Sequence, residues 1–338
     1  MLRSGRLELA ELPIPTVREG ELLVKMRSCG ICGTDIEKLS GEAITPPVLG
    51  HEVAGEVVEV GKDVKELSVG DRVFVHHHVA CGSCHYCLEG SETMCPLFLR
   101  TNIEPCGFSE FFKVPRDNVR RGAVLKLPLE VGFEEATLIE PLACCLRSLF
   151  KSGLKAGQSV AVIGCGPVGI LMAKAAKALG ASTVIGIEVF QPRITLAKKV
   201  GACEVIDGSS SDAEEEVKRA TGGIGADIVV VATGSPLAFQ QAFKLVRRGG
   251  TVSFFGAPPK EAKIALELGK VFYDEVRIVP SYSTTENETT RALALIKGRS
   301  VKVSDLITHR YSLEKAIDAF ETAMKGDALK VVVTSGRS

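Results

Sequence analysis

The strongest constraint on the fold is an alternation of apolar runs and amphipathic segments in the second half of the chain. Short runs rich in Val and Ile are expected to be strands, and the segments between them have apolar residues at helical spacing. The predicted strands are 159–164, 183–188, 203–207, 227–233, 251–256 and 277–283, and the predicted helices are 167–180, 191–201, 211–223 and 235–250. Continuous apolar strands between amphipathic helices indicate a parallel sheet covered on both faces, which is a doubly wound α/β arrangement.

A glycine-rich sequence lies where the first of these strands meets the first helix. GCGPVG at 164–169 fits the pattern G-x-G-x-x-G. The pattern is weak alone, but a strand before it and a helix after it give the context of a dinucleotide-binding turn. Such glycines let a pyrophosphate approach the helix N-terminus closely. The predicted cofactor-binding residues here are Gly164, Gly166, Pro167, Val168 and Gly169.

An acidic residue ends the second predicted strand. Glu188 lies 19 residues after Gly169, where a carboxylate would bind the adenosine ribose hydroxyls. A carboxylate at this place repels the 2′-phosphate of NADP, so the sequence predicts NAD as the cofactor. Arg193, five residues further on, is also a cofactor-binding candidate because it could partner a phosphate.

The first 130 residues have strand character instead. Val, Leu and Glu alternate over 19–26 and 52–60, and Gly and Pro interrupt the chain often, which favours an all-β sandwich or barrel-like domain. A helix is predicted over 133–150, with a break at Pro141. We expect three parts: a β domain at 1–131 with a cysteine-rich lobe at about 76–107, a dinucleotide-binding domain at 132–284, and a segment at 285–338 that packs back on the β domain.

Charge and hydropathy exclude several classes of partner. Lys and Arg total 41 and Asp and Glu total 41, so the 338-residue chain has no basic excess that would hold a nucleic acid. The most apolar stretch, 160–173, is too short to cross a bilayer, and the N-terminus has no apolar signal-peptide core. The expected setting is cytoplasmic, and the expected partner is a small molecule.

Four of the eleven cysteines are closely spaced. Cys81, Cys84, Cys87 and Cys95 have the spacing C-x2-C-x2-C-x7-C, which can close a tetrahedron of thiolates around a structural Zn²⁺. Disulfides are not expected in a large chain without a signal peptide. The neighbouring His76, His77 and His78 would alternate between the faces of a strand, so they cannot all bind one ion. They are interpreted as polar residues at a strand end.

Ligand types for a second metal ion occur at three other places. They are Cys32, the pair His51 and Glu52, and Glu140. Thiolate, imidazole and carboxylate together suit Zn²⁺. Each residue alone is weak support, but their occurrence beside a dinucleotide fold favours a catalytic metal.

The order of these motifs resembles that of the zinc-containing medium-chain dehydrogenase/reductase superfamily. The matching sequences are CGICGTD at 29–35, GHE at 50–52, GDRV at 70–73, the four-cysteine spacing, IEPL at 139–142 and GCGPVG at 164–169. They span nearly the whole chain and are most similar to the polyol (sorbitol-type) and threonine dehydrogenase branches. The resemblance implies a GroES-like β domain before a Rossmann domain, and a homodimer or homotetramer joined through the sheet edge near 276–283.

The resemblance also implies roles for the candidate site residues. Cys32 and His51 correspond to zinc ligands, and Glu52 to a residue that either binds the zinc or exchanges with water. Glu140 corresponds to the fourth, acidic ligand or to a residue that holds the zinc water, and Thr34 to the start of a proton relay. The family often has His five residues after the zinc Cys, where this chain has Glu37. Family members also usually have more residues before the segment that matches Arg6, so the start here is either trimmed or an abbreviated edge strand.

The predicted function is zinc-dependent transfer of a hydride from a secondary alcohol, polyol-like or amino, to NAD, with two Zn²⁺ per subunit. The zinc would act as a Lewis acid on the substrate oxygen, while Thr34 passes the proton outward. Alternatives are a simple-alcohol dehydrogenase of the same superfamily and a non-catalytic NAD-binding protein on this scaffold. The zinc-free quinone reductase type lacks the cysteine lobe, and zero net charge disfavours a zinc-ribbon nucleic-acid binder.

Overall fold

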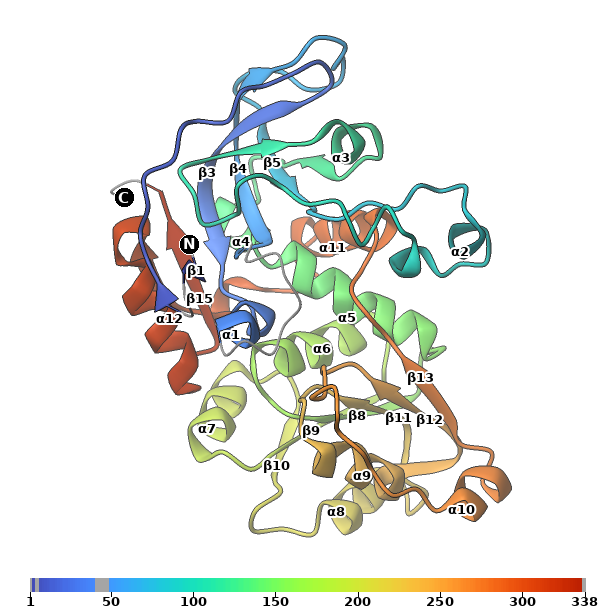
Figure 1. Ribbon diagram of the computed structural model, residues 1–338. Coiled ribbons are helices and arrows are strands. Elements are labelled where there is room, and N and C mark those ends of the chain that lie inside the picture. Colours follow the sequence, from blue (N-terminus) through green and yellow to red (C-terminus); the bar gives the residue numbers. More distant parts are fainter. Residues whose placement is uncertain (1, 4–5, 40–48, 336–338) are drawn as a thin grey trace. The chain divides into compact units, whose positions relative to one another are not determined.

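The computed structural model describes residues 2–3, 6–39 and 49–335, which form two compact units (Figure 1). The first unit comprises Met1–Ala143, Ser283–Arg299 and Val303–Ser338, and the second comprises Cys144–Tyr282 and Ser300–Lys302. None of the helices in the described ranges is long and apolar enough to cross a membrane.

The second unit contains a six-stranded sheet. Its strands are β8 (Ser159–Ile163), β9 (Thr183–Glu188), β10 (Glu204–Asp207), β11 (Ala226–Val231), β12 (Val246–Phe254) and β13 (Arg277–Pro280). They pair in the order β10-β9-β8-β11-β12-β13, and every pair is parallel. In chain order this is 3-2-1-4-5-6, the order of a doubly wound dinucleotide-binding sheet. The predicted α/β fold class is confirmed.

Helices follow the strands of this sheet. They are α6 (Pro167–Ala178), α7 (Gln191–Val200), α8 (Ala213–Ala220), α9 (Pro236–Leu245) and α10 (Leu268–Tyr273). Figure 1 shows α6 on one face of the sheet and α8 and α9 on the other. Strand β8 is buried along its whole length, so its apolar side chains contribute to the core on both faces.

An ion-pair network fixes three strands of this sheet at one end. The Asp227 carboxylate on β11 accepts hydrogen bonds from the amide and the hydroxyl of Ser159 on β8, at 2.8 and 2.7 Å. It also pairs with Arg247 on β12, whose Nε lies 2.8 Å away. Burial opposes ionisation, but the Ser159 amide and hydroxyl and Arg247 offset it, and the pKa of Asp227 is lowered.

The first unit is built on a mostly antiparallel sheet. Its main path is β14 (Ile307–Ser312), β15 (Lys330–Thr334), β3 (Leu22–Gly30), β4 (Glu52–Val60), β5 (Arg72–Val75) and β7 (Val124–Lys126). Strand β6 (Phe111–Val114) pairs with β3, and β1 (Leu2–Arg3) pairs with β2 (Arg6–Leu7). The core under β3 and β4 is mostly aliphatic, and Phe112 is the one aromatic side chain among the buried residues of this cluster.

Helices of the first unit range from 4 to 13 residues in length. They are α1 (Gly33–Leu39), α2 (His85–Leu88), α3 (Arg116–Arg120), α4 (Phe133–Ala136), α5 (Ile139–Lys151), which continues into the second unit, α11 (Glu286–Lys297) and α12 (Ala316–Lys325). Single 3₁₀ turns form at Glu92–Met94, Ser304–Leu306 and Leu313–Lys315.

Two predicted helix boundaries are wrong. The helix expected over 133–150 breaks between α4 and α5, at 137–138, and not at Pro141. Pro141 lies in the first turn of α5, where a backbone N–H would have no intrahelical partner to lose. The helix expected over 235–250 ends at Leu245, and Val246 already has extended backbone angles, φ −78° and ψ 139°. The following VRRGG belongs to β12.

Candidate metal and cofactor sites

The four closely spaced cysteines gather around one point. A single ligand atom from each of Cys81, Cys84, Cys87 and Cys95 lies within 4.8 Å of the others. The Sγ of Cys87 is 3.9 Å from that of Cys81 and 3.5 Å from that of Cys84. Four sulfurs at about 2.3 Å from a zinc ion stand about 3.8 Å apart, so the spacing in this loop fits Zn²⁺.

Backbone amides favour the thiolate form in this loop. The Cys84 N–H donates to the Cys81 Sγ at 3.3 Å, and the Cys81 N–H donates to the Cys95 Sγ at 3.3 Å. Hydrogen bonds from the amide and hydroxyl of Ser83, with that of the Cys84 amide, lower the pKa of Cys81 to about 5. A thiolate is the form that binds a metal.

Three of the four residues predicted for a second ion also lie together. Ligand atoms of Cys32, His51 and Glu52 lie within 4.8 Å of one another. Cys32 directly precedes α1, and His51 and Glu52 stand at the start of β4. Both His51 and Glu52 are buried, whereas Cys32 is half-buried. One thiolate, one imidazole and one carboxylate are a donor set that fits Zn²⁺.

The remaining predicted residues of this site differ in exposure. Glu140, in the first turn of α5, is buried, and its charge acts on both Glu52 and Lys330. Thr34 lies in the first turn of α1, two residues after Cys32, and is exposed.

Asp35 orients the ligand-bearing segments, although we assigned it no role from the sequence. Its carboxylate is fully buried and accepts hydrogen bonds from the amides of Gly50 at 2.9 Å and Cys32 at 3.1 Å. Its Oδ1 also lies 3.6 Å from the Nδ1 of His51. Burial lowers the pKa of His51, but Asp35 and Cys32 raise it by more, and the result is well above the usual range.

Lys330 is the second residue without a sequence-based role. It begins β15, is only 2% exposed, and its Nζ donates to both carboxylate oxygens of Glu52, at 2.8 and 2.6 Å. Burial lowers the pKa of Lys330, but Glu52 raises it by more, so its net pKa is raised. For Glu52, burial raises the pKa and Lys330 lowers it, with a net value above the usual one.

The three consecutive histidines follow β5 and are not within a strand. His76 and His77 are buried, and the His77 ring centroid lies 4.9 Å from that of His51. The Nδ1 of His76 lies 3.2 Å from Glu286 Oε1, and that of His78 lies 2.6 Å from the Thr101 carbonyl. Burial and the neighbouring imidazoles lower the pKa of His77 well below its usual value and that of His78 to about 3.

The glycine-rich turn has the geometry that its motif requires. Gly164 has φ +98°, and a Cβ on Gly169 would stand 1.8 Å from the Gly164 carbonyl oxygen. Gly166 precedes α6, and Pro167 occupies the first helical position. The turn therefore brings the backbone of β8 close to the N-terminus of α6. Because the glycines carry no side chains, a ligand can approach the backbone amides of the turn.

Glu188 already binds the backbone of this turn. One carboxylate oxygen accepts the Cys165 N–H at 2.9 Å, and the other accepts those of Val189 at 2.8 Å and Phe190 at 3.0 Å. A carboxylate has about four acceptor positions, so it retains capacity for a ligand hydroxyl. The guanidinium of Arg193 lies 3.9 Å from where a Cβ on Gly166 would stand.

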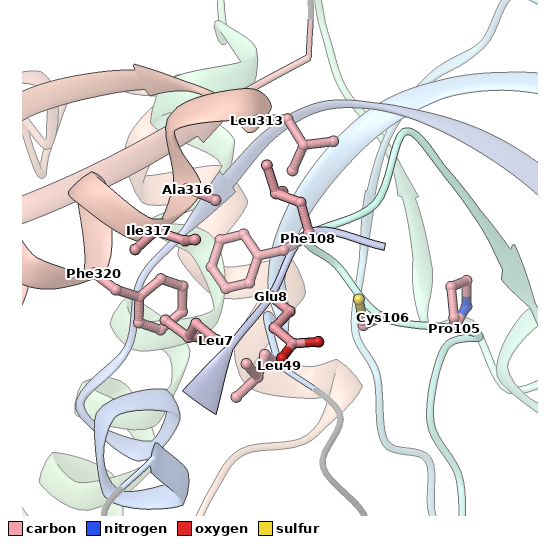
Figure 2. Close-up of a pocket in the computed structure, with 11 residues that line it drawn as sticks. Leu7, Glu8, Leu49, Pro105, Cys106, Phe108, Leu313, Ala316, Ile317 and Phe320 are labelled. Carbon is pink, nitrogen blue, oxygen red and sulfur yellow. The ribbon is translucent and has the colours of Figure 1, made fainter. Parts of the chain in front are cut away.

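A separate apolar pocket lies in the first unit (Figure 2). Phe108 and Phe320 pack edge to face there with ring centroids 5.3 Å apart, and Glu8 is the one acidic residue among those that line it. None of the candidate metal ligands lines this pocket.

Comparisons with known proteins agree with the fold and with the class of reaction. Residues 18–128 match the family model described as alcohol dehydrogenase GroES-like domain, and residues 167–298 match that described as zinc-binding dehydrogenase. The chain is 34% identical to sorbitol dehydrogenase of Bacillus subtilis (strain 168), over 100% of this chain and 96% of that protein. It is 32% identical to L-threonine 3-dehydrogenase of Bacillus licheniformis, over 95% of this chain and 93% of that protein.

A solved structure extends the likeness to three dimensions. The zinc-binding dehydrogenase of Sinorhizobium meliloti 1021, bound to NADP, superposes with a TM-score of 0.89 at 32% identity, covering 98% of this chain and 97% of that chain. Similarity at this level over the whole length, together with the dinucleotide turn and the two ligand clusters, places the chain in a family. The protein belongs to the zinc-containing medium-chain dehydrogenase/reductase superfamily and is an oxidoreductase.

Proposed function

We propose that the chain oxidises a polar secondary alcohol, a vicinal diol or an amino alcohol, with NAD as the hydride acceptor. The observation that carries this proposal is the cluster of Cys32, His51 and Glu52, with Glu140 acting electrostatically on Glu52. Such a cluster combines a single thiolate with carboxylates. The names of the relatives, sorbitol and L-threonine 3-dehydrogenase, support a polar substrate.

Each residue of the cluster has a proposed role. Cys32 and His51 would bind a catalytic zinc, and Glu52 and Glu140 would supply the nearby carboxylates. When bound, that ion supplies Lewis-acid chemistry at the substrate oxygen. The hydroxyl of Thr34, exposed at the first turn of α1, would carry the substrate proton to solvent. The lobe of Cys81, Cys84, Cys87 and Cys95 would hold a second, structural zinc.

The proposed preference for NAD rests on Glu188. Its carboxylate stands at the end of β9, beside the glycine-rich turn. A negative charge there accepts hydrogen bonds from ribose hydroxyls and repels a 2′-phosphate. Arg193 argues against this preference, because its guanidinium is near Gly166 and can pair with a phosphate.

A substrate panel tests the reaction. Purified protein loaded with zinc would be given NAD and secondary alcohols, polyols, sugar acids or threonine, and the absorbance of the reduced nicotinamide would be followed. We expect the highest kcat/KM with a vicinal diol or an amino alcohol. Ethanol as the best substrate by a wide margin would contradict the proposed substrate class, and inactivity on the whole panel would contradict the proposed reaction.

Cofactor choice is tested separately. The ratio of kcat/KM with NAD to that with NADP should exceed one in the parent protein and fall in Glu188→Gln, which removes the charge but keeps the shape. Arg193→Gln is the matched variant, and it should leave the ratio unchanged or increase it. A parent protein that prefers NADP would refute the role given to Glu188.

We also propose that the protein forms a homodimer or homotetramer through the edge strand β13. Ile278 on this edge is 38% exposed, and Phe272, Tyr273 and Tyr282 beside it in sequence are more than half exposed. Exposed aromatic groups next to an unpaired strand edge favour association. Light scattering after size-exclusion chromatography should give a dimer or tetramer for the parent and a smaller species for Ile278→Lys.

A further inference from the structure

The apolar pocket of the first unit has no part in the proposed hydride transfer (Figure 2). Its volume is about 210 Å³. A dry apolar cavity of about 150 Å³ can hold one benzene molecule, so this pocket has room for a compact molecule with a single ring. A diol, an amino alcohol or NAD would lose hydrogen bonds to water here without replacing them, which is costly. The pocket therefore suits a third kind of molecule.

The lining of the pocket selects an uncharged occupant. All of its lining residues except Glu8 and Cys106 have hydrocarbon side chains. Burial raises the pKa of the Cys106 thiol, so this group stays uncharged and packs as a small apolar side chain. Among the described residues no Lys, Arg or His lines the pocket, and the carboxylate of Glu8 repels an anion. An anionic ligand would thus be buried without a partner.

Two phenylalanine rings in the wall favour an aromatic occupant over an aliphatic one. Phe108 and Phe320 pack edge to face, with ring centroids 5.3 Å apart and an interplanar angle of 71°. Figure 2 shows both rings at the pocket. Aromatic rings in such a geometry attract each other beyond the effect of buried area, because the positive edge of one ring meets the negative face of another. A third ring in the pocket can extend this arrangement.

Phe108 also contacts the backbone beside a candidate metal ligand. A Cβ on Gly50 would stand 2.7 Å from the Cδ2 of Phe108 and 2.9 Å from its backbone nitrogen. The Gly107 N–H donates to the Gly50 carbonyl at 3.0 Å, and the Gly50 N–H donates to Asp35 at 2.9 Å. Gly50 directly precedes His51. Any displacement of the Phe108 ring therefore acts on the segment that positions His51.

A second connection runs through the core. Leu49 and Phe320 line the pocket and belong to the same buried cluster as Ile31. Ile31 directly precedes Cys32, as Leu49 precedes the segment of His51. Because protein interiors are close-packed, they transmit a change in volume to neighbouring segments. One wall of the pocket is thus continuous with both segments that carry candidate metal ligands.

We propose that this pocket is an effector site, which binds a compact neutral aromatic molecule and thereby stabilises the segments that carry Cys32 and His51. The candidate ligands do not line the pocket, so the occupant would act through Phe108, Gly50 and Leu49 and not by contact with a metal ion. The proposal goes beyond the proposed function and does not depend on it, because binding can be measured without zinc, NAD or an alcohol.

Fluorobenzene is the probe for binding. Its fluorine resonance would be followed by NMR as the parent protein is added, and we expect saturable binding of one molecule per chain. The anion para-fluorobenzoate has the same ring and should bind at least about 10-fold more weakly, because burial of an unpaired charge is costly. Equal affinity for the two probes would contradict the selection of an uncharged occupant.

Two variants test the position of the site. Ala316→Phe places a ring inside the pocket and should weaken fluorobenzene binding at least about 10-fold, since a filled cavity has no room for a ligand. Leu9→Asp places a charge in the wall at a residue that is 55% exposed, so the variant should fold, and it should also weaken binding. Met324→Phe is the matched control, because Met324 is exposed on α12 and does not line the pocket.

Hydrogen exchange, read by mass spectrometry, tests the connection to the candidate metal site. At a fluorobenzene concentration about ten times its Kd, a segment that must empty the pocket in order to open should exchange about 10-fold more slowly. We expect this change in peptides that contain Gly50 and Gly107, whose amides donate the hydrogen bonds described above. Peptides from the loop of Cys81 to Cys95 should be unchanged, and so should all peptides of Ala316→Phe.

Three outcomes would overturn the inference. Absence of saturable binding to the parent would exclude the site, and so would fluorobenzene binding of parent affinity in both Ala316→Phe and Leu9→Asp. Saturable binding that leaves the exchange of the Gly50 and Gly107 peptides unchanged would exclude the effector role. A protein that passes these tests but oxidises no alcohol would refute the proposed function alone.

Discussion

Replacing Asp35 by Asn should weaken the catalytic metal site without changing the shape of the side chain. The Asp35 carboxylate accepts amide hydrogen bonds from Gly50 and Cys32 and lies 3.6 Å from His51 Nδ1. It therefore ties the segment that carries Cys32 to the segment that carries His51. Asn keeps one acceptor oxygen and places an NH₂ group where the second amide donates.

The expected size of the effect follows from these contacts. A buried amide without an acceptor costs about 1–3 kcal/mol of folding stability. Loss of the group that orients a metal-binding histidine costs about 10–100-fold in metal affinity, which corresponds to about 1.4–2.8 kcal/mol. Asp35→Asn should therefore be less stable to urea and should bind the labile zinc about 10–100-fold more weakly.

Proton competition sets the pH at which the affinity should be measured. Zinc binds neutral imidazole, and Asp35 helps to raise the pKa of His51 well above its usual value. In the parent, zinc affinity should fall as pH drops through this raised pKa. In Asp35→Asn the pKa of His51 is lower, so zinc affinity begins to fall at a lower pH. The difference in zinc affinity between the two proteins is therefore largest in alkaline buffer.

Competition with a chromophoric chelator measures the affinity directly. The four-cysteine lobe serves as the internal reference, since Asp35→Asn should leave its zinc in place. Asp71→Asn is the matched substitution, because Asp71 also accepts an amide hydrogen bond but pairs with Lys126, away from the candidate ligands. A zinc affinity of Asp35→Asn within about threefold of the parent at alkaline pH, well below the range for such residues, would refute the reasoning.

Three further predictions can be checked with the same protein. Thr34→Ala should lower kcat about 10²–10⁴-fold at unchanged zinc content, and full activity across the pH range would exclude the relay. A chelator should remove one zinc early, with loss of activity, and the second only under harsher treatment, with a fall in Tm; elemental analysis and calorimetry follow these changes. Simultaneous loss of both ions with unfolding would contradict the difference between an open and an all-thiolate site. Asp227→Asn should lower the free energy of unfolding, measured with urea at neutral pH, by about 1.5–3 kcal/mol. This difference from the parent should shrink as pH falls below about 4, because the lowered pKa of Asp227 gives stability that is lost when the carboxylate is protonated. A difference that does not depend on pH would show that the charge of Asp227 is unimportant.

Local patterns explain why much of the fold could be predicted. The glycine-rich turn and the four-cysteine loop each lie within a few residues, so their spacing alone reports their geometry. The parallel sheet follows from uninterrupted Val and Ile runs. The start of β12 was predicted as helix because VRR continues the amphipathic pattern of α9. The sequence of β14, ITHRYS, lacks the apolar alternation that predicts a strand.

The residues that complete the metal site have no such local signal. Lys330 reads as an ordinary lysine at the start of a Val-rich strand, and its pairing with Glu52 spans 278 positions. Asp35 stands inside a recognisable motif, yet only the folded chain shows that its carboxylate reaches Gly50, 15 positions away. Long-range pairing depends on sheet register, which one sequence does not reveal.

The two candidate zinc sites should form at different stages of folding. The four-cysteine loop links residues 14 positions apart or fewer, so a short stretch of chain can collect its ion with little loop-closure entropy. The other site needs β15 to insert beside β3, which joins Ile31 to Lys330 across 299 positions. During synthesis the cysteine loop can therefore capture metal while later strands are still being made. The catalytic position gains its buried pair with Lys330 only once β15 has docked, so its full set of neighbouring charges is assembled later than the cysteine loop.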